Sequence, residues 1–174
     1  MGYKRIMLKI SGEVLGGPDG NGADASALLA LAKQIKEVTK KGIQVAIVVG
    51  GGNFWRFRDN KNLKICRPTS DTIGMMATIM NARLLKEALE NVGVKAHALA
   101  PHADGYFAEL YVPQKGHRLL SQKEVVICGG GTGNPYFTTD SAAALRALEL
   151  GCDVLMKATK VDGVYDSDPV KNKK

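Results

Sequence analysis

The feature that most constrains the fold is an apolar segment at residues 43–49, rich in β-branched residues, that leads directly into Gly50, Gly51 and Gly52. An apolar run without polar alternation is typical of a strand buried on both faces of a parallel sheet. Parallel strands need long crossover connections, which are usually helices. The segment therefore predicts an α/β fold in which a central strand ends at a glycine-rich turn.

Apolar patterning along the rest of the chain alternates between strand and helix periods. We expect strands at residues 3–10, 43–49, 94–99, 124–128 and 153–158, and helices at about 24–41, 69–90 and 138–150. Residues 100–122 are less regular. Asp24 is the expected N-cap of the first helix, and Gly42 its expected stop. Right-handed crossovers between parallel strands then predict a three-layer αβα sandwich, formed as a single domain over residues 1–174.

Composition excludes several protein classes. Charged residues make up 24% of the chain and hydrophobic residues 45%, which is incompatible with disorder over most of the length. No apolar run approaches the length of a membrane span, and the N-terminus does not resemble a signal peptide, so we expect a cytoplasmic protein without a membrane partner. Cys66, Cys128 and Cys152 lack the spacing of a disulfide framework or a metal site.

The net charge of +7 favours anionic partners but does not identify them. Part of the excess lies at residues 56–67, for which a solvated surface is the simplest interpretation. The neighbouring Phe54 and Trp55 are compatible with stacking on a base or with core packing. No recognisable nucleic-acid-binding motif accompanies them, which argues against a nucleic-acid partner.

Unusual turns follow four of the expected strands, at residues 9–13, 50–53, 129–135 and 157–163. Ligands of open parallel sheets bind at the carboxyl ends of the strands, so these turns should meet at one edge. Glycines let backbone N–H groups approach a phosphate closely, and two such loops favour nucleotide binding. The common fingerprints are absent: there is no Walker A motif, and Trp55 and Asn134 replace the last glycine of the dinucleotide pattern.

Charged residues at these strand ends have alternative interpretations. Lys9 and Lys157 would need an anion opposite them if buried, although Lys9 could instead extend into solvent. Asp140, at an expected helix start, could simply complement the helix dipole. His97, His102 and His117 have no spacing that suggests a catalytic pair or a metal site.

Five segments together resemble the bacterial uridylate kinases of the amino acid kinase family. They are KISGE at residues 9–13, GGGNFWR at 50–56, DTIGMMAT at 71–78, GTGNPYFTTD at 131–140 and KATKVDGVY at 157–165. The fourth segment distinguishes this branch from the acetylglutamate, carbamate and aspartate kinases that share the fold. The resemblance spans nearly the whole chain.

The resemblance implies transfer of the γ-phosphoryl group of ATP to UMP, with Mg²⁺, in pyrimidine nucleotide biosynthesis. By resemblance the catalytic residues are Lys9, Arg56, Asp140 and Lys157. ATP would be bound by Lys9, Ile10, Ser11, Gly12, Gly52, Arg56, Thr159, Tyr165 and Asp168. UMP would be bound by Gly51, Asp71, Thr132, Gly133, Asn134, Pro135, Tyr136, Phe137, Thr138 and Thr139. No protein residue is assigned as a metal ligand. The family also suggests a homohexamer, with GTP and UTP as effectors.

The chain departs from the family pattern in three places. Residues 57–59 stand where relatives usually place a glycine, and residues 112–116, with Pro113 and Gly116, are expected to interrupt a helix found in relatives. Relatives also continue beyond Asp168, so we expect a complete UMP-binding part and an incomplete ATP-binding part. Two functions stay open: an active UMP kinase, or a regulatory module that binds UMP without turnover.

Overall fold

The computed structural model describes residues 2–59, 61–102 and 105–158. These residues form a six-stranded sheet in the order β4-β3-β5-β2-β1-β6, in which every pairing is parallel. The strands are β1 (Arg5–Ile10), β2 (Gln44–Val49), β3 (Ala96–Ala100), β4 (Glu109–Leu110), β5 (Val125–Cys128) and β6 (Val154–Ala158). The five expected strands are confirmed, and the short β4 is an addition from the stretch expected to be irregular.

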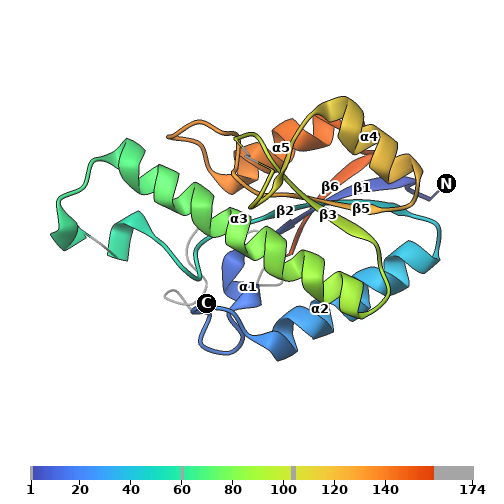
Figure 1. Ribbon diagram of the computed structural model, residues 1–174, viewed down its shortest axis with the longest axis horizontal. Coiled ribbons are helices and arrows are strands. Elements are labelled where there is room, and N and C mark those ends of the chain that lie inside the picture. Colours follow the sequence, from blue (N-terminus) through green and yellow to red (C-terminus); the bar gives the residue numbers. More distant parts are fainter. Residues whose placement is uncertain (1, 60, 103–104, 159–174) are drawn as a thin grey trace, which may run out of the picture.

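Helices cover both faces of the sheet and complete the expected three layers (Figure 1). They are α1 (Gly12–Leu15), α2 (Ala25–Lys40), α3 (Arg67–Asn91), α4 (Pro113–Ser121) and α5 (Thr139–Glu149). One apolar core joins the sheet to α1, α2 and α3, and includes Ile47 and Leu85. A second core lies under α4 and α5 and includes Val48 and Leu120. Neighbouring residues of β2 thus enter opposite cores, which explains why this strand is apolar from residue 45 to residue 49.

The helix boundaries follow local chemistry. The side chain of Asp24 accepts a hydrogen bond of 2.7 Å from Ala27 N, as an N-cap should. Gly42, with φ 79°, lies just beyond the end of α2. Helix α3 begins two residues earlier than expected because Pro68 lies in its first turn, where a missing N–H costs nothing.

The expected interruption at residues 112–116 is wrong. Pro113 begins α4 instead of breaking it, since the first helical position needs no N–H donor. Gly116 then remains inside the helix, where a Cβ would lie 2.5 Å from Leu150 Cδ2. The glycine that weakens the helix locally thus allows it to pack closely against the end of α5.

Parallel pairing brings the carboxyl ends of the strands to one edge of the sheet. The turns after β1, β2 and β5 meet there, and the last two are bonded to the middle of α3 at Asn81 and Thr78. Within the described residues, no helix combines the length and apolarity that crossing a membrane requires.

Candidate functional site

A carboxylate held between two lysines forms the charged part of this edge. Lys9 on β1 and Lys157 on β6 are direct partners in the strand register, so their side chains lie on the same face. Asp140, in the first turn of α5, receives Lys9 Nζ at 2.9 Å on Oδ1 and Lys157 Nζ at 2.8 Å on Oδ2. The side chain of Lys9 is only 11% exposed, so the solvent-directed alternative is wrong. Asp140 does more than complement a helix dipole.

Burial and charge act in opposite directions on Asp140. Partial burial raises the pKa of its carboxyl, but hydrogen bonds from Lys157 and Lys9 outweigh this and the net shift is downward. The group is therefore ionised at neutral pH. One carboxylate balances two ammonium groups, which leaves a net positive centre beside the glycine-rich turns.

The β2 loop (residues 50–56) packs against the turn after β1. Gly50 N donates to Ile10 O at 2.8 Å, and a Cβ on Gly12 would lie 2.8 Å from Gly50 O and 2.9 Å from Gly52 N. At the end of the loop, Arg56 Nε donates to Gly52 O at 2.7 Å, and Arg56 Nη2 lies 2.5 Å from Glu13 Oε1. The bond to Gly52 O closes the loop on itself, and the two contacts together fix the guanidinium group of Arg56.

The residues predicted around this loop differ in what they can offer. Ser11 is the N-cap of α1, and Gly12 is the first residue of that helix. The side chain of Ile10 is fully buried in the core, and its carbonyl is engaged by Gly50. Because Ile10 is paired with Val49 in the parallel β1–β2 ladder, its backbone N–H is engaged by the sheet as well.

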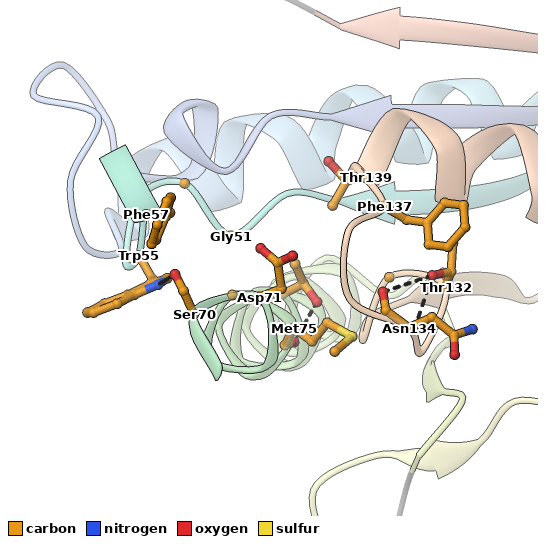
Figure 2. Close-up of a pocket in the computed structure, with 14 residues that line it drawn as sticks. Gly51, Trp55, Phe57, Ser70, Asp71, Met75, Thr132, Asn134, Phe137 and Thr139 are labelled. Atoms are coloured by element: carbon orange, nitrogen blue, oxygen red, sulfur yellow. Dashed lines mark hydrogen bonds between the residues drawn. The ribbon is translucent and has the colours of Figure 1, made fainter. Parts of the chain in front are cut away.

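A cavity of about 150 Å³ lies between α3, the β2 loop and the β5 loop (residues 129–138). Figure 2 shows aromatic rings of Trp55, Phe57 and Phe137 around it, with Asp71 and Met75 contributed by α3. Its lining is Gly51, Gly52, Trp55, Phe57, Ser70, Asp71, Gly74, Met75, Thr78, Gly131, Thr132, Asn134, Phe137 and Thr139. Apolar walls with a few polar groups are typical of a site for a small organic ligand.

Six of the ten residues predicted to bind UMP line this cavity. They are Gly51, Asp71, Thr132, Asn134, Phe137 and Thr139. The other four, Gly133, Pro135, Tyr136 and Thr138, belong to the same loop but not to the cavity wall. Thr138 has another task, since its Oγ1 accepts from Ser141 N at 3.1 Å and caps α5.

Asp71 is already well engaged. Arg67 Nε donates to both of its oxygens, at 2.7 and 2.9 Å, and Tyr136 N donates to Oδ2 at 2.7 Å. A carboxylate offers about four acceptor positions. Oδ1 therefore retains capacity for a donor from a ligand, while Oδ2 holds the β5 loop.

Three small residues of α3 were missed by sequence reasoning. Ser70, Gly74 and Thr78 recur every fourth position and form one face of the helix toward the cavity. Their spacing was a usable signal, because small side chains at this period let another backbone approach closely. A Cβ on Gly51 would indeed lie 2.8 Å from Gly74 O.

The remaining sequence expectations concern metals, histidines and the adenine side. Among the described residues no group of three or more His, Cys, Asp or Glu side chains could hold a metal ion. His97 lies between Glu109 and Glu124, with ring nitrogens 2.8 and 2.7 Å from their oxygens. Thr159, Tyr165 and Asp168, predicted for the adenine nucleotide, fall outside the described residues.

Comparison with known proteins gives one consistent family. A model of the amino acid kinase family matches residues 4–174. The uridylate kinases of Methylococcus capsulatus and Rickettsia prowazekii are each 48% identical over 170 residues, which is 98% of this chain and 71% and 70% of theirs.

Solved structures agree with the sequence relatives. The UMP kinase from Bacillus anthracis superposes with a TM-score of 0.93 at 34% identity, over 99% of this chain and 72% of that one. The UMP kinase from Ureaplasma parvum gives 0.91 at 39% identity, over 100% and 74%. On this sequence and structural similarity, the chain belongs to the amino acid kinase family and groups with its uridylate kinases.

Proposed function

We propose that the protein transfers the γ-phosphoryl group of ATP to UMP, forming UDP and ADP, as a step of pyrimidine nucleotide synthesis. The observation that carries the proposal is the Lys9–Asp140–Lys157 arrangement beside two glycine loops and a cavity. Uridylate kinase relatives at 48% identity support the choice of substrate. Phosphoryl transfer needs positioning and charge stabilisation more than covalent chemistry, and this edge offers both.

In the proposed mechanism, the two lysines neutralise phosphate charge from opposite sides of Asp140. Lys9 faces the transferring phosphoryl group, Lys157 faces the ATP side, and Asp140 holds both ammonium groups in place. Arg56, fixed by Glu13 and Gly52 O, adds a third cation at the end of the β2 loop. Free N–H groups of the glycine turns would bind phosphate oxygens.

UMP would occupy the cavity between α3 and the two glycine loops. Trp55, Phe57 and Phe137 provide flat apolar surfaces that suit a pyrimidine ring. The remaining acceptor capacity of Asp71 Oδ1 suits a ribose hydroxyl. The phosphate of UMP would then lie toward the β2 loop and the lysines.

The site suits Mg²⁺ that is held by the nucleotide phosphates and water, because the carboxylate of the site is already paired with two lysines. Mg²⁺ typically keeps several waters and binds one or two carboxylates together with substrate phosphates. Asp140 is the carboxylate of the lysine pair, and its oxygens are engaged by ammonium groups. When bound, Mg²⁺ would supply charge neutralisation on the phosphates.

The proposal extends to assembly and regulation by resemblance. We expect a cytoplasmic homo-oligomer, a hexamer in the family pattern, that responds to GTP and UTP. The exposed side chains of Met76 and Met80 on α3 offer apolar surface for contacts between copies.

A coupled assay for ADP release tests the proposal, with Mg²⁺, ATP and UMP, CMP or AMP in parallel. We expect turnover confined to UMP. Lys9→Met should lower kcat at least a hundredfold with little change in UMP affinity, because only the charge that faces the transferring group is lost. Lys40→Met, which removes an exposed lysine paired with Glu37, is the matched control.

Two other outcomes would change the assignment. An equal loss of kcat and UMP affinity in Lys9→Met would contradict the role of Lys9. If the unmodified protein binds UMP without turnover, the function to assign is that of a regulatory module that binds UMP, not that of a kinase.

A further inference from the structure

Helix α3 holds both glycine loops, each at two points. On the β2 loop, Asn81 Nδ2 donates to Gly50 O at 2.7 Å, and Trp55 Nε1 donates to Ser70 Oγ at 2.9 Å. On the β5 loop, Gly130 N donates to Thr78 Oγ1 at 2.7 Å, and Tyr136 N donates to Asp71 Oδ2 at 2.7 Å. Residues 70–81 of one helix thus anchor the start and the end of both loops.

Asn81 is the centre of the contact to the β2 loop. It is fully buried, and it exchanges hydrogen bonds of 2.7 and 3.0 Å with the side chain of Asn53. Asn53 Nδ2 also donates to Gly22 O, and Gly22 N donates to Asn53 O at 2.8 Å. A buried amide is costly unless its hydrogen bonds are satisfied, and here every one is directed at a loop.

Thr78 has the equivalent position for the β5 loop. Its hydroxyl donates to Met75 O at 2.7 Å, which orients the oxygen lone pairs toward Gly130 N. Gly129 lies close to the helix as well, since a Cβ there would be 3.0 Å from Ile79 Cα. Thr78 and Asn81 are three residues apart, so they lie on the same face of α3 as near neighbours.

We propose that Asn81 and Thr78 are positioning residues, and that α3 between them sets the separation of the two glycine loops across which the phosphoryl group passes. The inference rests on the proposed function, because it assigns the β5 loop to UMP and the β2 loop to the transferring phosphates as well as to one wall of the UMP cavity. In-line transfer tolerates little misplacement of the reacting atoms. Thr78 and Asn81 are separated by less than one turn of regular helix, which is stiff enough to keep the two loops at a fixed distance.

Two substitutions separate the anchors. Asn81→Ala removes the amide from the β2 loop, and Thr78→Val removes the acceptor of Gly130 N at nearly constant volume. Leu85→Val is the control, because Leu85 is buried one turn further along α3 and belongs to the apolar core. Asn81→Ser replaces Asn81→Ala should the latter not fold.

Hydrogen exchange of the ligand-free protein is the first measurement. Asn81→Ala should speed exchange in residues 50–56 at least tenfold and leave residues 131–138 unchanged. Thr78→Val should do the reverse, Thr78→Ser should restore protection, and Leu85→Val should not distinguish the loops. Equal responses of both loops to each variant, or no response, would overturn the proposal.

Kinetics and titration supply a second measurement that a purely structural role would not reproduce. Asn81→Ala should lower kcat at saturating ATP and UMP at least twentyfold, a larger factor than the rise in the Kd of UMP, to which the β2 loop contributes only one wall. Thr78→Val should raise the Kd of UMP at least tenfold. Parallel losses in both variants would contradict separate anchoring. Failure of the unmodified protein to bind UMP would refute the proposed function, while the exchange pattern would still decide whether the anchors act separately.

Discussion

The two glycine loops have similar sequences but need glycine for different reasons. In the β2 loop, Gly50, Gly51 and Gly52 all have backbone conformations open to other residues, and none has a positive φ. Space is the constraint there, since a Cβ on Gly51 would meet Gly74 O at 2.8 Å and Ala77 Cβ at 3.0 Å. In the β5 loop, Gly130, Gly131 and Gly133 have φ values of 73°, 57° and 87°.

The difference shows that a run of glycines in a sequence does not reveal whether limited space or a positive φ requires them. At Gly51, close approach opposes any side chain, whatever its backbone preference. In the β5 loop, Gly131 is limited by its positive φ alone and is open to residues that adopt the left-handed region. Gly130 and Gly133 are crowded as well, because a Cβ would lie 2.8 Å from Pro101 Cδ and 3.0 Å from His102 Nε2, respectively. A rank order of substitutions that follows backbone preference at Gly131 should therefore be absent at Gly51.

The largest effect is expected for Gly51→Ala. The added methyl group would contact the backbone of α3, which cannot move aside, so the β2 loop must shift away. We expect a loss of about 2 kcal/mol in the free energy of unfolding, measured by urea denaturation, and at least a hundredfold loss of kcat. Gly52→Ala is the matched control, since its Cβ would meet only the flexible Arg56 side chain at 3.3 Å. Equal destabilisation by both variants would remove steric crowding as the cause.

A smaller effect is expected at Gly131. Its Cβ position is open, with Met75 Cγ the nearest atom at 3.8 Å, so only the φ of 57° opposes a side chain. Gly131→Val should cost about 1–2 kcal/mol of unfolding free energy, and Gly131→Asn clearly less. In the β2 loop this order should vanish, because Gly51→Asn and Gly51→Val both meet the helix. Equal costs for the two substitutions at Gly131 would contradict the conformational explanation.

Much of this fold could be predicted because its signals are local. The apolar run before Gly50 and the cap at Asp24 each depend on a few neighbouring residues, and both predictions are confirmed. The helix at Pro113 was misjudged because the effect of proline depends on its position in the helix, which the sequence pattern did not fix.

The site could be predicted only in part. Lys9, Asp140 and Lys157 were singled out from their positions at the ends of expected elements, and the structure brings them together. Asn81 gave no comparable signal, because a polar residue inside a long helix is ordinary on a solvent-facing side. The spacing of Thr78 with Ser70 and Gly74 indicated close packing but not a hydrogen bond to a loop. The burial of Asn81 and Thr78 against two loops, 28 to 52 residues away in the chain, is a tertiary property.

A smaller effect is expected at the C-terminal end of the β2 loop, where Trp55 is bonded to Ser70. Ser70→Ala removes the acceptor of Trp55 Nε1, and should cost about 1 kcal/mol of unfolding free energy. Trp55 is the single tryptophan of the chain, so its fluorescence reports on this loop alone. We expect a shift in emission in Ser70→Ala and none in Ser121→Ala, which removes a hydroxyl bonded to His117 O. An unchanged spectrum would mean that Ser70 does not hold the loop.

The smallest effect concerns the pH dependence of stability, through the carboxylate that follows the β5 loop. The pKa of Asp140 is lowered overall, because the hydrogen bonds from Lys157 and Lys9 outweigh its partial burial. A lowered pKa contributes stability that is fully present above the unfolded value of about 3.9 and is lost as pH falls through the folded value. Asp140→Asn should therefore be less stable than the unmodified protein at pH 7, and the gap should close below about pH 4. Because Asp140 is half exposed, solvent screening keeps the gap small. Urea denaturation at pH 7, 5 and 3.5 measures it, and a gap that stays constant with pH would show that the lysine contacts stabilise the fold without their charge.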